Sequence, residues 1–124
     1  MAKILVVDDE REIVKLFSDM LAKEGFQVLT ATSGQDCLRL AEKEKPDLIL
    51  LDVMMPGMDG GQTLQNLLDN EKTKNIRVIF LTSIISKEEE EEQMGVIGGR
   101  SFISKFSAKD DILNKINTAL GIGT

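Results

Sequence analysis

Short uninterrupted apolar runs recur along the chain and alternate with segments in which apolar residues are spaced three or four positions apart. The two strongest runs are residues 4–7, Ile-Leu-Val-Val, and residues 48–51, Leu-Ile-Leu-Leu. Runs of this kind predict strands that are buried on both faces, as in a parallel sheet. Residues 27–31 and 76–81 predict two further strands, and the shorter run at residues 102–103 predicts a fifth strand at a sheet edge.

The segments between and after these strands have the spacing of amphipathic helices, and five helices are predicted. Ser33 is a start signal for the second helix, and Gly25 is a stop signal for the first. Asp9, Ser86 and Ser107 are expected to cap the first, fourth and fifth helices. The apolar residues expected to face the core from the first, third and last helices are Ile13, Val14, Phe17, Met20, Leu21, Leu64, Leu67, Leu68, Ile112, Ile116, Ala119 and Leu120.

Strands that alternate with helices favour an α/β fold, a doubly wound five-stranded parallel sheet with helices on both faces. No internal repeat, low-complexity linker or change of composition divides the 124 residues, a length that suits one domain. We therefore expect a single domain over residues 1–124, in which residues 121–124 form a frayed tail.

Composition narrows the classes of function. Fifteen basic and 21 acidic residues give a net charge of −6, which disfavours binding to nucleic acid or to an anionic membrane. No apolar run is long enough to span a bilayer, and the first run meets Asp8 and Asp9 too soon for a signal peptide, so a cytoplasmic location is expected. The single cysteine, Cys37, is expected to be a small, half-buried hydrophobe. Because the chain has no histidine, any chemistry must use carboxylates, hydroxyls and lysine.

Polar residues follow four of the five predicted strands. Each has an ordinary structural explanation, as a helix cap, a strand end or a solvated charge. The carboxyl ends of parallel strands, however, lie at one edge of a sheet, so these side chains are expected to meet there. In chain order they are Asp8, Asp9, Asp52, Thr82 and Lys105.

Such a set of residues indicates phosphoryl-transfer chemistry. Three carboxylates at one edge repel one another, so the site needs a cation. Oxygen ligands without histidine or cysteine indicate Mg²⁺, which keeps coordination positions for water and phosphate oxygens. A lysine and a hydroxyl supply a positive charge and a hydrogen-bond donor for phosphoryl oxygens. A carboxylate can itself be the nucleophile and form an aspartyl-phosphate.

Over essentially its whole length the chain resembles the receiver domains of two-component response regulators, of the stand-alone, chemotaxis-regulator type. The resemblance implies a flavodoxin-like sheet with strand order 2-1-3-4-5. The matching residues are Asp8-Asp9 after Ile-Leu-Val-Val, Asp52 within Leu-Leu-Asp-Val-Met-Met-Pro-Gly-Met-Asp-Gly, Leu81-Thr82-Ser83 and Ser104-Lys105.

By this resemblance, Asp52 is the phosphoacceptor. Asp9, Asp52 and the backbone carbonyl of Met54 would bind Mg²⁺ directly, and Asp8 would act largely through water. Lys105 would pair with the phosphoryl group. These roles describe a self-phosphorylating and self-dephosphorylating signalling domain rather than a metabolic enzyme.

The resemblance also implies a switch. Thr82 would bond the phosphoryl group after transfer, and Phe102 falls where the family has its aromatic switch residue. The donor would be a histidine kinase, a phosphotransfer protein or a small phosphodonor. An unidentified output protein would bind the face made by the fourth helix, the fifth strand and the fifth helix, and phosphorylation-dependent dimerisation is left open.

The chain departs from the family at Phe106, where most members have a proline joined to the lysine by a cis bond. The Lys105–Phe106 bond is therefore either trans, with a rebuilt loop, or cis and strained. This departure supports one alternative, a degenerate receiver that binds proteins without being phosphorylated. A second alternative, a Mg²⁺-dependent aspartyl-phosphate phosphatase, expects an Asp where Met54 stands and an additional cap domain.

Overall fold

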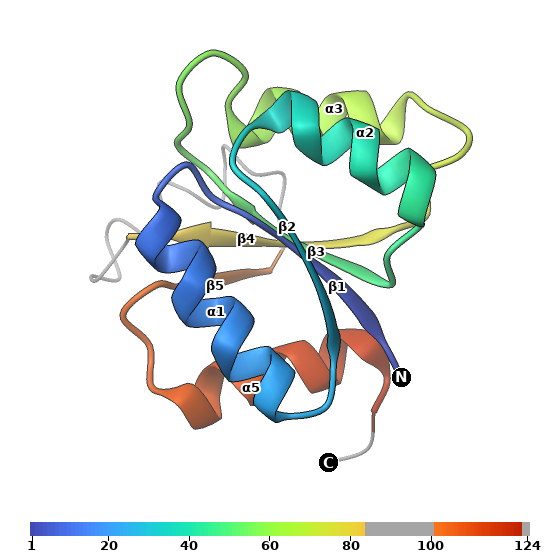
Figure 1. The fold of residues 1–124 in the computed structure, drawn as a ribbon. Coiled ribbons are helices and arrows are strands. Elements are labelled where there is room, and N and C mark those ends of the chain that lie inside the picture. Colours follow the sequence, from blue (N-terminus) through green and yellow to red (C-terminus); the bar gives the residue numbers. More distant parts are fainter. Residues whose placement is uncertain (84–100, 123–124) are drawn as a thin grey trace.

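The computed structural model describes residues 1–83 and 101–122 (Figure 1). The fourth predicted helix, with its expected cap Ser86, falls outside the described residues, as do residues 123–124. The strands are β1 Lys3–Val7, β2 Gln27–Ala31, β3 Leu48–Asp52, β4 Arg77–Thr82 and β5 Phe102–Ser104. The helices of the described residues are α1 Arg11–Lys23, α2 Gly34–Glu44, α3 Gly60–Leu68 and α5 Lys109–Leu120.

All five strands are parallel and lie in the order β2-β1-β3-β4-β5, so the predicted fold class and strand order are confirmed. Helices α1 and α5 cover one face of the sheet, and α2 and α3 cover the other (Figure 1). Strand β4 begins at Arg77 rather than at residue 76, and β5 lies at the sheet edge as expected.

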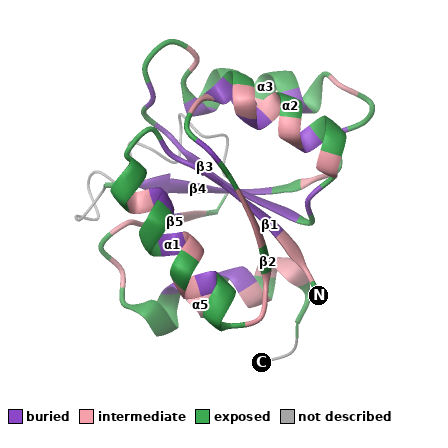
Figure 2. Ribbon diagram, in the orientation of Figure 1, coloured by how far each residue is buried: buried purple, intermediate pink, exposed green. Residues whose placement is uncertain are grey.

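The uninterrupted apolar runs have a simple cause, because both faces of the central strands are buried (Figure 2). In β1, Ile4 and Val6 pack on the α1/α5 side, whereas Leu5 and Val7 pack on the α2/α3 side. All four have no exposed surface. Strand β3 alternates in the same way. The sheet is therefore a rigid layer that fixes the positions of the residues at its ends.

Two of the predicted helix boundaries are confirmed. Ser33 caps α2, and its hydroxyl accepts a hydrogen bond of 3.1 Å from the Asp36 N–H. Gly25 follows the end of α1 with a φ of +93°, a backbone conformation that favours glycine. Cys37, on α2, has no exposed surface and is thus more deeply buried than predicted. Burial raises the pKa of its thiol to about 12, so the thiol is inert at neutral pH.

Two predicted caps are wrong. Glu10, not Asp9, precedes α1, because the Asp8 carboxylate accepts the Glu10 N–H and delays the helix by one residue. Ala108, not Ser107, precedes α5, and the Ser107 N–H closes a turn on the Ser104 carbonyl. Among the helices of the described residues, none is long and apolar enough to cross a membrane.

Candidate functional site

Three carboxylates meet at the carboxyl ends of the two central strands. Asp8 directly follows β1, and Asp52 ends β3, the strand that pairs with β1. One carboxylate oxygen from each of Asp8, Asp9 and Asp52 lies within 4.8 Å of the other two. Asp8 and Asp52 are buried, at 0% and 2% exposure, whereas Asp9 is exposed to solvent. The sheet thus holds two desolvated negative charges side by side, with a third at the rim.

Lys105 brings a positive charge to this cluster from beyond the edge strand. Its Nζ lies 2.8 Å from Asp8 Oδ2, 3.3 Å from Asp52 Oδ1 and 3.4 Å from Glu10 Oε1. The side chain is only 6% exposed. Its backbone N–H donates a 2.7 Å hydrogen bond to the Thr82 carbonyl, so the end of β4 fixes the start of the loop that carries the lysine.

The Lys105–Phe106 peptide bond is trans, because no cis bond occurs in the described part of the chain. The loop is rebuilt around hydrogen bonds to Ser104, whose hydroxyl accepts the Phe106 N–H at 3.2 Å. A proline at position 106 has no N–H to donate. Lys105 therefore reaches the carboxylates on a loop of different construction, and Phe106 itself is 70% exposed. The one departure that favoured a degenerate receiver has not displaced the lysine.

The charges of the site shift two pKa values. Burial and, secondarily, the negative charge of Asp8 raise the pKa of Asp52 to about 7, against the opposing effect of Lys105. Burial by itself lowers the pKa of Lys105, but the hydrogen bond with Asp8 and the charges of both aspartates outweigh it and leave that pKa raised. Near neutral pH, Asp52 is thus divided between its protonated and ionised forms, while Lys105 is charged.

The buried oxygens fit a hard divalent cation. Asp52 Oδ1 lies 3.2 Å from the Met54 N–H, but Asp52 Oδ2 is buried without a hydrogen-bond partner among the described residues. Buried carboxylate oxygens are normally paired, and an unpaired one beside two further carboxylates is a ligand set of the kind that Mg²⁺ prefers. The Met54 side chain points to solvent and is 74% exposed.

Thr82 lies at the same carboxyl edge of the sheet, whereas Phe102 begins β5 and is the register partner of Phe80. Thr82 is buried and ends β4, one residue beyond Leu81, the register partner of Asp52. Phe102 is half-buried in β5. The Lys115 ammonium of α5 donates a 2.9 Å hydrogen bond to the Phe102 carbonyl and lies 5.5 Å from the centre of its ring.

Two charged residues of this region are absent from the sequence-based predictions. Glu10 contacts Lys105, and Lys115 contacts Phe102. The run Asp8-Asp9-Glu10 is a signal for the first, but an acidic residue at a helix start is common for reasons of helix stability alone. Lys115 lies on the polar face of α5 and gives no local signal.

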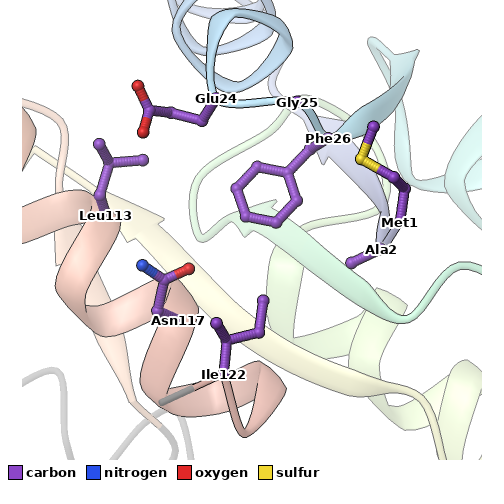
Figure 3. Close-up of a pocket in the computed structure, with 8 residues that line it drawn as sticks. All are labelled: Met1, Ala2, Glu24, Gly25, Phe26, Leu113, Asn117 and Ile122. Atoms are coloured by element: carbon purple, nitrogen blue, oxygen red, sulfur yellow. The ribbon is translucent and has the colours of Figure 1, made fainter. Parts of the chain in front are cut away.

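A separate cavity of about 280 Å³ lies at the opposite edge of the sheet, where β1 and β2 begin (Figure 3). Apolar side chains from three parts of the chain face it, with Glu24 and Asn117 at its margin. It offers none of the carboxylates described above. Its lining residues are Met1, Ala2, Glu24, Gly25, Phe26, Leu113, Asn117 and Ile122.

Comparison with known proteins agrees with this geometry. PilH of Pseudomonas aeruginosa is 37% identical over 122 residues, which cover 97% of this chain and 98% of PilH. The response regulator PleD of Caulobacter vibrioides is 45% identical over 83 residues, but the match covers only 18% of PleD. The structure of the chemotaxis protein CheY4 of Vibrio cholerae superposes with a TM-score of 0.83 at 30% identity, covering 96% of this chain and 98% of CheY4. Residues 4–117 match the response regulator receiver domain family, and the chain belongs to that family.

Proposed function

We propose that the protein is a phosphorylation-dependent signalling switch whose phosphoacceptor is Asp52. The observation that carries this proposal is the Asp52 carboxylate itself. Among the described residues, one of its buried oxygens has no hydrogen-bond partner, and the carboxylate lies beside two further carboxylates and an ammonium group. One carboxylate oxygen attacks the phosphorus of the donor and forms a new O–P bond. The bond between phosphorus and the donor breaks, the leaving group keeps its electron pair, and an acyl phosphate results.

The surrounding residues would bind the metal ion and the phosphoryl oxygens. Asp8, Asp9, Asp52 and the Met54 carbonyl would hold Mg²⁺, which when bound offsets the negative charge of the carboxylates and phosphoryl oxygens. The Lys105 ammonium, 3.3 Å from Asp52 Oδ1, pairs with the phosphoryl oxygens.

Switching follows from the new charge. The Thr82 hydroxyl bonds the phosphoryl group, and Phe102 turns inward into the space that Thr82 leaves. The protein then shifts between two packings of the face made by β5, α5 and the expected fourth helix, and an output protein binds this face. Family membership supports a histidine kinase or a phosphotransfer protein as the donor. We propose that the exchange takes place in the cytoplasm.

Intact mass after exposure to a small-molecule phosphodonor tests this function. The mass is expected to rise by one phosphoryl group when Mg²⁺ is present and to stay unchanged when a chelator removes it. Protein that binds Mg²⁺ but gains no mass from any donor would instead favour a binding module that works without phosphorylation.

Mg²⁺ affinity is expected to rise about tenfold between pH 6 and pH 8. The pKa of Asp52 is about 7 without the ion, so the carboxyl is mostly protonated at pH 6, and binding must displace that proton. At pH 8 the Asp52 carboxylate is already ionised and has no proton to lose. Calorimetric titration with Mg²⁺ at both values measures the change. Asp52→Asn is the control and should lose most of the dependence; an affinity that is flat in the wild type would contradict the prediction.

A further inference from the structure

The Glu10 side chain, at the start of α1, reaches across the fold to Lys105. Glu10 occupies the cap position of α1, with φ −87° and ψ 108°, yet its side chain makes no capping hydrogen bond. Serine, threonine, aspartate and asparagine are the side chains that cap well, and glutamate is not among them. Instead, Glu10 Oε1 lies 3.4 Å from the Nζ of Lys105, a residue 95 positions away in the sequence.

The three carboxylates that contact the Lys105 ammonium are not equivalent. Asp8 and Asp52 belong to the group that would hold the divalent cation. When they share their charge with that cation, their attraction for the ammonium weakens. Glu10 lies outside that group and keeps its full charge. In the cation-loaded site, Glu10 is therefore the carboxylate that retains its hold on the lysine.

The exposed fractions of the Lys105 and Glu10 side chains show how Glu10 can orient the lysine. Lys105 is 6% exposed and Glu10 is 63% exposed, so Glu10 lies on the solvent side of the ammonium. A lysine side chain is flexible, and many of its conformers point to water. A carboxylate at the rim selects the conformers that reach the phosphoacceptor.

We propose that Glu10 is a positioning residue that holds the Lys105 ammonium beside Asp52 while the cation is bound, and so speeds phosphoryl transfer. This inference rests on the proposed function. Glu10 does not touch the transferred group; it acts through Lys105. The Glu10 contact, at 3.4 Å, adds to the contacts of the Lys105 ammonium with Asp8 and Asp52, and it is the one that lies outside the cation-binding group.

The test compares the rates at which three variants accept a phosphoryl group from a small-molecule donor at saturating Mg²⁺. Glu10→Gln is expected to slow the reaction about threefold to fivefold, the size of a single exposed charge contact. Glu10→Asp keeps the charge but is one methylene shorter, and is expected to be slow as well. Glu12→Gln removes the same charge from the exposed first turn of α1 and is expected to stay within about 1.5-fold of the wild type.

Fluorine NMR of the adduct with beryllium trifluoride, an analogue of the phosphoryl group, gives a readout that a change in helix stability does not move. One of the fluorine resonances is expected to shift in Glu10→Gln and Glu10→Asp but not in Glu12→Gln. Equal rates for Glu10→Gln and Glu12→Gln, or a wild-type rate for Glu10→Asp, would overturn the positioning role alone. A wild-type protein that accepts no phosphoryl group would overturn this role and the proposed function together.

Discussion

Replacing Asp52 with asparagine is expected to abolish phosphoryl acceptance and, without Mg²⁺, to make the protein more stable at pH 8. The first effect follows from chemistry, because the amide has no carboxylate oxygen to attack phosphorus. The second follows from burial, because an ionised Asp52 lies at 2% exposure beside the negative charge of Asp8. The residue that we propose as the phosphoacceptor is thus expected to destabilise the folded state at this pH.

The size of the stability effect depends on pH. The pKa of Asp52 is 3.8 in a model compound and about 7 in the folded protein, so the native state binds more protons between these values. The contribution of Asp52 to wild-type stability is therefore expected to fall as pH rises from about 4 to 7, by at most about 4 kcal/mol. The stability of the asparagine variant does not fall in this way, because the amide does not ionise. In that variant, however, Lys105 no longer has the Asp52 carboxylate as an ion-pair partner. We expect a net gain of about 2 kcal/mol at pH 8.

Urea unfolding of both proteins at pH 5 and pH 8, with and without Mg²⁺, measures this gain. The advantage of Asp52→Asn should be small at pH 5 and largest at pH 8. It should shrink with Mg²⁺, because the ion stabilises the native wild type by binding to it. An equally large advantage at both pH values would show that its cause is packing rather than charge. Residual phosphorylation of the variant would mean that another residue accepts the group.

The strand pattern was readable from the sequence because the central strands are buried on both faces and carry no polar interruption. Helix starts were less readable. Asp9 is as good a cap as Ser33 by residue type, but the Asp8 carboxylate binds the Glu10 N–H and shifts the start of α1. A hydrogen bond between neighbours in the chain decided that boundary, and residue type alone does not show it.

The carboxylates and the lysine could be placed at one edge because parallel strands deliver their carboxyl ends together. The sequence did not decide whether the Lys105–Phe106 peptide bond is cis or trans, because the same residues are compatible with both isomers. Glu10 was missed for a different reason. Its contact with Lys105 joins opposite ends of the chain, and its exposed charge has an ordinary explanation at a helix start.

Gly60 ends the sequence motif that carries Asp52, and the structure gives it a specific role. Gly60 begins α3, is buried, and donates its N–H to the Val53 carbonyl at 3.0 Å. A Cβ at this position would lie 2.5 Å from the Asp52 carbonyl oxygen and 2.9 Å from the Val53 Cα, with the Phe80 ring at 3.1 Å. Both backbone atoms belong to Asp52, the proposed phosphoacceptor, or to the residue that follows it.

Gly60→Ala is therefore expected to destabilise the protein by about 2 kcal/mol and to slow phosphoryl acceptance. Overpacking a filled site costs about 1–3 kcal/mol. The backbone atoms it meets cannot rotate away as a side chain would, so α3 or the end of β3 must move. Urea unfolding measures the loss of stability, and intact mass over time with a phosphodonor and Mg²⁺ measures the rate of phosphoryl acceptance.

The adjacent glycine is a matched control. Among the described residues, a Cβ on Gly61 would meet only Asp59 Oδ1, at an ordinary 3.4 Å. Gly61→Ala therefore makes the same chemical change in the same helix turn without a clash in that part of the chain. It should leave phosphorylation unchanged and raise stability by up to about 1 kcal/mol, since alanine favours the helix over glycine. If both variants accepted the phosphoryl group at the wild-type rate, α3 would be free to shift without disturbing Asp52. Loss of activity in Gly60→Ala alone would instead show that the start of α3 holds the phosphoacceptor in place.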